Sequence, residues 1–88
     1  MPSHPRPTLV LTQNHLSLVA LYANGRSLRE ISDLTMVAYT TVRRRLDDAK
    51  ALTRSETLTH LIASCVADGA IVKGANGFQP SVDPTSLE

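Results

Sequence analysis

A helix stop is followed at once by a helix start in the stretch NGRSLRE. Asn24-Gly25 can end a helix, because glycine takes the left-handed C-terminal conformation without steric cost. Directly after it, Ser27 and Glu30 have the spacing of a capping box, in which each side chain accepts a hydrogen bond from the backbone amide of the other residue. The chain is therefore expected to form one short helix before Gly25 and another directly after Ser27.

Apolar residues at helical spacing predict four short helices in all. The first follows Thr12, whose hydroxyl can cap its first turn, and the third covers about residues 38–51. A second capping box from Thr53 to Glu56 predicts the start of the fourth helix, and Gly69 predicts its end. The expected inward positions are Leu16, Leu18, Val19 and Leu21, then Leu28, Ile31 and Leu34, then Val42, Leu46 and Ala49, and finally Leu58, Leu61, Ile62, Cys65 and Val66.

These helices predict an all-α fold, a tetrahelical helix-turn-helix bundle with a flexible N-terminal arm and a flexible C-terminal tail. The arm is the proline-rich segment 1–10, the helical domain covers 11–72, and the tail covers 73–88. Within the tail, Asn76-Gly77 is a turn signal that would allow a minor hairpin. An isolated pair of short strands is marginally stable in water, so the flexible tail is the preferred expectation.

Composition excludes several classes of protein. An 88-residue chain with 42% apolar residues can bury one small core, and no apolar run reaches the roughly 18 residues of a membrane span or resembles a secretory signal. Cys65 is the only cysteine, and His4, His15 and His60 lack ligand spacing, so no metal site is expected. No catalytic constellation or phosphate-binding loop is present. We expect a cytoplasmic protein that is not an enzyme and has no cofactor, small-molecule substrate or membrane partner.

The modest net charge of +1 conceals an uneven distribution. Between Arg26 and Arg54 there are seven basic and four acidic residues, a local charge of +3, whereas the chain from Ser55 onward carries −3. Three consecutive arginines lie in the expected third helix, behind the buried position of Val42. The middle of the chain is therefore the expected surface for a polyanion.

A set of residues at fixed spacings runs through the expected helices: Leu11-Thr12, Val19, Leu21, Ala23-x-Gly25-x-Ser27, Glu30-Ile31, Thr41-Val42, Leu46, Arg54-Ser55-Glu56 and Gly69-Ala70-Ile71. At these positions the chain resembles a known family, the LuxR-type (GerE-like) DNA-binding domain of bacterial transcription regulators. The resemblance covers residues 11 to about 71, and the third helix departs from it at Ala38, where the family usually has a capping serine.

The resemblance implies that the second helix braces the DNA backbone, the third enters the major groove and the fourth forms a dimer contact. Its base-reading positions fall on Arg43, Arg44 and Asp47, and its backbone contacts fall on Thr40, Thr41 and the helix start near Ser27. The outer residues Thr57, His60 and Ser64, beside Leu61, offer the dimer surface.

Side-chain chemistry points to the same surface. A guanidinium can donate to both O6 and N7 of guanine, which suits Arg43 and Arg44, and Asp47 can accept from a cytosine amino group or hold Arg43 in place. We expect Tyr39 to contact bases as well. The alternative roles for Tyr39 are a hydrogen bond to a phosphate and simple packing within the protein. The expected phosphate contacts are Thr40, Thr41, Ser27, Arg29, Arg26 and Lys50.

The sequence therefore predicts sequence-specific binding of double-stranded DNA by a small bacterial or phage transcription regulator, a homodimer at least on DNA, located on the nucleoid. The alternative is a protein-interaction module. The stretch TVRRRLDDAKAL is also similar to the region-four domain of bacterial sigma factors, and the short connection after Ala49 favours that reading. In that case RNA polymerase or another regulatory protein is the expected partner.

Overall fold

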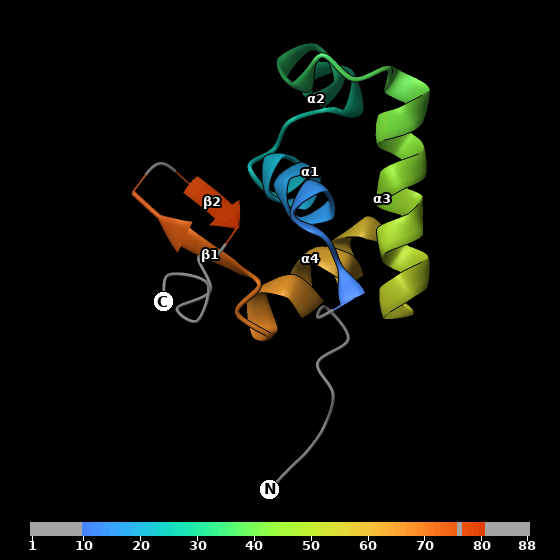
Figure 1. Ribbon diagram of the computed structural model, residues 1–88. Coiled ribbons are helices and arrows are strands. Elements are labelled where there is room, and N and C mark those ends of the chain that lie inside the picture. The colour runs from blue at the N-terminus through green and yellow to red at the C-terminus, as the bar shows by residue number, and fades with distance from the viewer. Residues whose placement is uncertain (1–9, 76, 81–88) are drawn as a thin grey trace, which may run out of the picture.

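The computed structural model describes residues 10–75 and 77–80, and most of the predicted arm and the outer half of the predicted tail lie outside these ranges. In chain order the elements are α1 (Gln13–Ala23), α2 (Leu28–Thr35), α3 (Tyr39–Thr53), α4 (Leu58–Ala67), β1 (Ile71–Gly74) and β2 (Gly77–Pro80), as Figure 1 shows. None of the helices in this part of the chain is long and apolar enough to cross a membrane.

The first two helices begin where their capping residues predict. The Ser27 Oγ accepts from the Glu30 amide at 3.1 Å, and the Ser27 amide donates to Glu30 Oε1 at 2.9 Å, which confirms the capping box of α2. This hydrogen bond from the Ser27 backbone lowers the pKa of Glu30. At α1, Thr12 Oγ1 accepts from the His15 amide at 3.3 Å, and His15 Nδ1 accepts from the Thr12 amide at 3.1 Å. The His15 side chain therefore fills the role of the usual Glu.

The predicted capping box from Thr53 to Glu56 is wrong. Thr53 is the last residue of α3, and its hydroxyl donates to the Ala49 carbonyl at 2.8 Å. The helix continues past residue 51 because Thr53 falls on its inward side and is buried. Helix α4 begins later, with Thr57 Oγ1 accepting from the His60 amide at 3.0 Å.

Helix ends need residues with positive φ, and glycine supplies only some of them. Gly25, with φ 90°, and Gly69, with φ 77°, follow α1 and α4 and confirm the two predicted stops. The ends of α2 and α3 instead use Met36, with φ 58°, and Arg54, with φ 57°. A left-handed conformation costs an L-residue roughly 1–2 kcal/mol. The turn between α2 and α3 thus forms without the glycine that such a turn favours.

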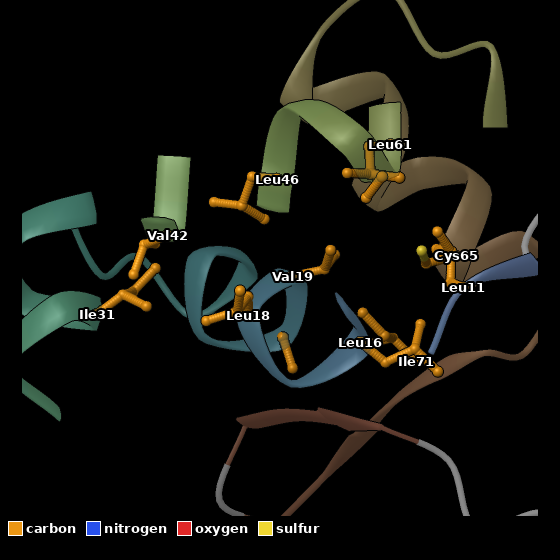
Figure 2. Close-up of a cluster of buried hydrophobic side chains, with 12 residues drawn as sticks. Leu11, Leu16, Leu18, Val19, Ile31, Val42, Leu46, Leu61, Cys65 and Ile71 are labelled. Carbon is orange, nitrogen blue, oxygen red and sulfur yellow. The ribbon is translucent and has the colours of Figure 1, made fainter. Parts of the chain in front are cut away.

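Helix α1 is buried on more than one side. Leu16 and Leu18 lie two residues apart, so their side chains point in directions about 200° apart around the helix, and both are buried. Figure 1 shows α1 between α3 on one side and the two strands on the other. In Figure 2, Leu46 and Leu61 reach toward Val19 of this helix. The buried core consists of Leu11, Leu16, Leu18, Val19, Ala20, Ile31, Val42, Leu46, Ala49, Leu61, Cys65 and Ile71.

The two strands form an antiparallel hairpin, so the predicted all-α class is wrong. Ile71 pairs with Pro80 and belongs to the core, and the hairpin packs on α1 and α4. Asn24 fastens it, because its Nδ2 donates to the Phe78 carbonyl at 2.9 Å and its Oδ1 accepts from the Phe78 amide at 2.6 Å. The hairpin is stable because it covers the second side of α1 and does not stand alone.

Two residues of the predicted apolar stripes face outward. Leu34 of α2 is 57% exposed and Val66 of α4 is 43% exposed. Each lies on the edge of its stripe, where helical spacing alone does not decide whether a neighbouring element covers the side chain. The inward positions of α3 are confirmed, since Val42, Leu46 and Ala49 are all buried.

Candidate nucleic-acid interface

The outward face of α3 carries the arginines that the sequence singled out. Residues on an α-helix advance about 100° each, so three consecutive side chains cannot share one direction. Arg43 and Arg44 are exposed, whereas Arg45 is half-buried on the flank of the helix. In the described part of the chain none of the three forms an ion pair. Arg43 and Arg44 are therefore free to bind an external anion or base edge.

Asp47 has a partner, and this partner is not Arg43. Its Oδ1 lies 3.5 Å from Lys50 Nζ, three residues along the helix. The carboxylate offsets the Lys50 charge, so the strongest unpaired positive charge on this face belongs to Arg43 and Arg44. Asp47 and Lys50 both remain at the surface or its edge, Asp47 exposed and Lys50 half-buried.

The N-terminus of α3 differs from that of the other helices. Its N-cap residue is Ala38, which has no side chain that can accept a hydrogen bond. Among the described residues, the amides of Tyr39, Thr40 and Thr41 have no hydrogen-bond partner. Amides left free at a helix start, together with the positive end of the helix dipole, favour an anion.

The predicted phosphate contacts on α2 fall into two kinds. The hydroxyl of Ser27 accepts from the Glu30 amide, and the Ser27 amide donates to the Glu30 carboxylate. Arg26, which precedes Ser27, has its Nη1 3.9 Å from Glu30 Oε2. The Glu30 carboxylate therefore already occupies the start of α2. Arg29 instead lies over the ring of Tyr39, with its guanidinium carbon 5.7 Å from the ring centroid. The structure thus joins Arg29 of α2 with the first residue of α3.

Arg54 is a basic residue of this surface that sequence reasoning missed. It is exposed, follows the last turn of α3, and has no ion-pair partner in the described ranges. Its place among the basic residues between Arg26 and Arg54 is the signal that could have found it. Helical spacing does not apply to it, because Arg54 has φ 57° and follows the last helical residue. The 15 residues of α3 span about 22 Å, so these charges follow most of its length.

The predicted dimer surface on α4 needs one correction. Leu61 is 0% exposed and lies in the core, so it cannot meet another chain at the surface. Thr57 and His60 are exposed, and Ser64 is half-buried. The sequence of α4, LTHLIASCVA, contains no Asp, Glu, Lys or Arg. Its outward surface therefore carries none of these four charged side chains.

Cys65 and the histidines form no metal centre in the described ranges, where no group of three or more His, Cys, Asp or Glu side chains could hold an ion. Cys65 is buried, and this burial, followed by the charge of Asp68, raises the pKa of its thiol to about 11. Such a thiol is protonated and unreactive at neutral pH.

The structure brings together most of the residues predicted to meet DNA. Arg43, Arg44, Thr40 and Tyr39 lie on α3, and Arg29 reaches Tyr39 from α2. Comparisons with known family models, curated proteins and solved structures find no match to this chain.

Proposed function

We propose that this chain is a small transcription regulator that binds specific sequences of double-stranded DNA, with α3 in the major groove. One observation carries the proposal. The outward face of α3 combines two exposed arginines, which form no ion pair in the described part of the chain, with a helix start whose amides lack partners there. A surface that needed only solvation would gain stability from a capping side chain and from carboxylates beside the arginines.

The arginines of this surface suit the base edges of DNA, and the start of α3 suits the phosphates. Arg43 and Arg44 can each donate to O6 and N7 of a guanine, a contact worth about 1–3 kcal/mol of discrimination against the wrong base. The free amides at the helix start and the hydroxyl of Thr40 suit phosphate oxygens, which position the helix without reading sequence. Arg54 lies farther along and adds positive charge directly after the end of α3, whereas the charge of Lys50 is offset by Asp47.

The resemblance to LuxR-type domains supports the same assignment. It extends to Ile71, the first residue of β1, so most of the hairpin lies outside it. Under this proposal α2 and α3 act as a helix-turn-helix pair, and the protein works in the cytoplasm on the nucleoid of a bacterium or on phage DNA.

A homodimer on DNA is the second part of the proposal, and α4 supplies its contact. An uncharged outward surface with exposed Val66 can be buried without desolvating a charge, whereas the outward face of α3 cannot. Thr57, His60 and Ser64 are the predicted contacts that remain after the removal of Leu61. Two copies would read half-sites about one helical turn apart, roughly 34 Å.

A second candidate function has its own observation in its favour. Met36 is 93% exposed in the connection between α2 and α3, and Leu34 beside it is also exposed. Apolar side chains grouped at the surface are more typical of a protein contact than of a phosphate contact. They favour a module similar to sigma-factor region four, with RNA polymerase or another regulatory protein as its partner.

The test is retention of fragmented genomic DNA from the source organism at several salt concentrations. We expect wild-type protein to retain particular fragments at physiological salt, and Arg43→Ala/Arg44→Ala to lose them. For each phosphate contact removed, the slope of log affinity against log salt should fall by about 0.9. Lys73→Ala is the control, because Lys73 lies on the hairpin, across α1 from α3, over the ring of Phe78.

Weak retention that does not depend on the fragment and survives the arginine changes would contradict DNA reading. Leu34→Ser/Met36→Ser then tests the alternative, because a polymerase-binding module should lose its partner with these changes and keep it in the arginine variant.

A further inference from the structure

Arg26, which precedes the N-cap of α2, and Arg29, which lies in α2, are matched in sequence but not in their contacts. Each has a carboxylate four residues later, Glu30 for Arg26 and Asp33 for Arg29. Arg26 pairs with its carboxylate at 3.9 Å. Arg29 forms no ion pair in the described ranges and lies over the Tyr39 ring of α3, 5.7 Å from the centroid. The arginine that turns away from its own helix is the one that reaches α3.

We propose that Tyr39 is a positioning residue that holds the Arg29 guanidinium for one phosphate of the DNA backbone, so that Arg29 and not Arg26 is the phosphate contact of α2. This inference rests on the proposed function and gives Tyr39 a role other than the base contact that the sequence predicts for it. The contact with the ring uses none of the guanidinium N–H groups, and in the described ranges Arg29 donates no side-chain hydrogen bond. All five donors are available to phosphate oxygens.

Positioning matters because an exposed arginine has many rotamers. Fixing such a side chain on binding costs conformational entropy and therefore lowers the affinity. A side chain that is already held in place before binding loses less entropy. Tyr39, whose ring the guanidinium contacts, is the first residue of α3, and the uncapped start of this helix leaves amides that also favour an anion. Arg26 lacks this advantage, since part of its charge is offset by Glu30.

The experiment measures binding to one retained DNA fragment over a salt series with single and double variants. Arg29→Ala should weaken binding and reduce the salt slope by about 0.9, the effect of one phosphate contact. Tyr39→Leu should weaken binding about two- to fivefold, the size expected of an exposed cation–π contact, whereas Tyr39→Phe should bind nearly as wild type, because a phenyl ring also attracts the cation. In an Arg29→Ala background, Tyr39→Leu should have no further effect. Arg26→Ala is the matched control and should weaken binding less than Arg29→Ala.

Two results would overturn the proposal. If the effects of Arg29→Ala and Tyr39→Leu multiply, the residues act independently. If Tyr39→Phe binds as weakly as Tyr39→Leu, the hydroxyl and not the ring contacts DNA. A DNA-free readout separates this outcome from failure of the proposed function, because the ring current of Tyr39 should shift the NMR signals of the Arg29 side chain, and Tyr39→Leu should remove the shift. If wild type binds no fragment, the DNA function fails, and the shift still decides whether the ring holds Arg29.

Discussion

Helices α3 and α4 contribute to the same core, but their outward surfaces differ in charge. Each buries an apolar stripe against α1, with Leu46 on α3 and Leu61 on α4. On the outside, α3 carries arginines, and its N-cap residue Ala38 has no side chain that can cap the helix. In contrast, α4 has no Asp, Glu, Lys or Arg and is capped by the side chain of Thr57. Since the inward halves suffice to hold both helices in place, the outward halves are free to differ, and their difference points to different partners.

The comparison also separates residues that support folding from residues that support binding. Substitutions at exposed positions away from caps usually change stability by less than about 0.5 kcal/mol, while truncation of a buried leucine costs far more. A change on the outside of α3 should therefore alter function and leave the fold intact. The reverse is expected for the inside of either helix.

The largest expected effect treats the two helices alike. Leu46→Ala and Leu61→Ala should each lower the free energy of unfolding by about 2–5 kcal/mol, because each removes buried methyl groups and leaves a cavity. Urea unfolding followed by circular dichroism measures this loss. Leu52→Ala, at an exposed position of α3, is the control and should change stability little. A small effect at either buried leucine would show that the two helices do not share one core.

The next effect separates the helices. Arg43→Ala/Arg44→Ala should weaken specific DNA binding by about 1–3 kcal/mol for each guanine that is no longer read, and the unfolding midpoint should stay unchanged. Fluorescence anisotropy with a retained fragment measures the affinity. A comparable double change on the outside of α4, Thr59→Ala/Ala63→Ser, should leave the affinity for a DNA duplex with a single half-site unaltered, because one domain reads that duplex without the α4 contact. Equal losses from both helices would erase the distinction between the two surfaces.

The helix starts sharpen the comparison further. Ala38→Asp gives α3 the cap that α4 already has and should raise stability by about 1 kcal/mol, while its carboxylate occupies the free amides and weakens DNA binding. Thr57→Ala should lower stability by about the same amount without affecting the DNA face. Thermal melts and DNA titrations of both variants test the pair. If Ala38→Asp binds DNA as tightly as wild type, the start of α3 does not meet phosphate.

A last prediction concerns the dependence of stability on pH. The pKa of the Cys65 thiol is raised from 9.0 to about 11 in the folded chain, so the folded state favours the neutral thiol. The stability that this provides is fully present below pH 9 and is lost as the pH rises toward 11. Cys65→Ala should therefore flatten the fall in stability over this range. Unfolding curves of both proteins from about pH 8 to about pH 11 measure it, and parallel pH profiles would argue against a perturbed thiol.

Features that depend on neighbouring residues were predictable from the sequence. The Ser27–Glu30 box, the cap at Thr12 and the stops at Gly25 and Gly69 all use hydrogen bonds or backbone conformations within a few residues. The inward stripe of α3 followed from helical spacing, and with it the outward position of Arg43 and Arg44. Leu61 is buried, as its place in the inward stripe of α4 predicts, and it therefore cannot serve as the dimer contact that the family resemblance suggested.

Three features of the structure depend on tertiary contacts alone. Thr53 and Glu56 fitted a local capping box, yet burial of Thr53 against the core extended α3 through it. The hairpin forms because α1 offers a second apolar side and because Asn24 binds Phe78, 54 residues away in sequence. Arg29 meets Tyr39 only because α2 and α3 pack together. The sequence by itself thus determined where α1 and α2 start, where α1 and α4 stop and which face of α3 is basic, since these depend on local geometry. Contacts between distant segments decided the fold class and the partners of the site residues, since no local pattern encodes them.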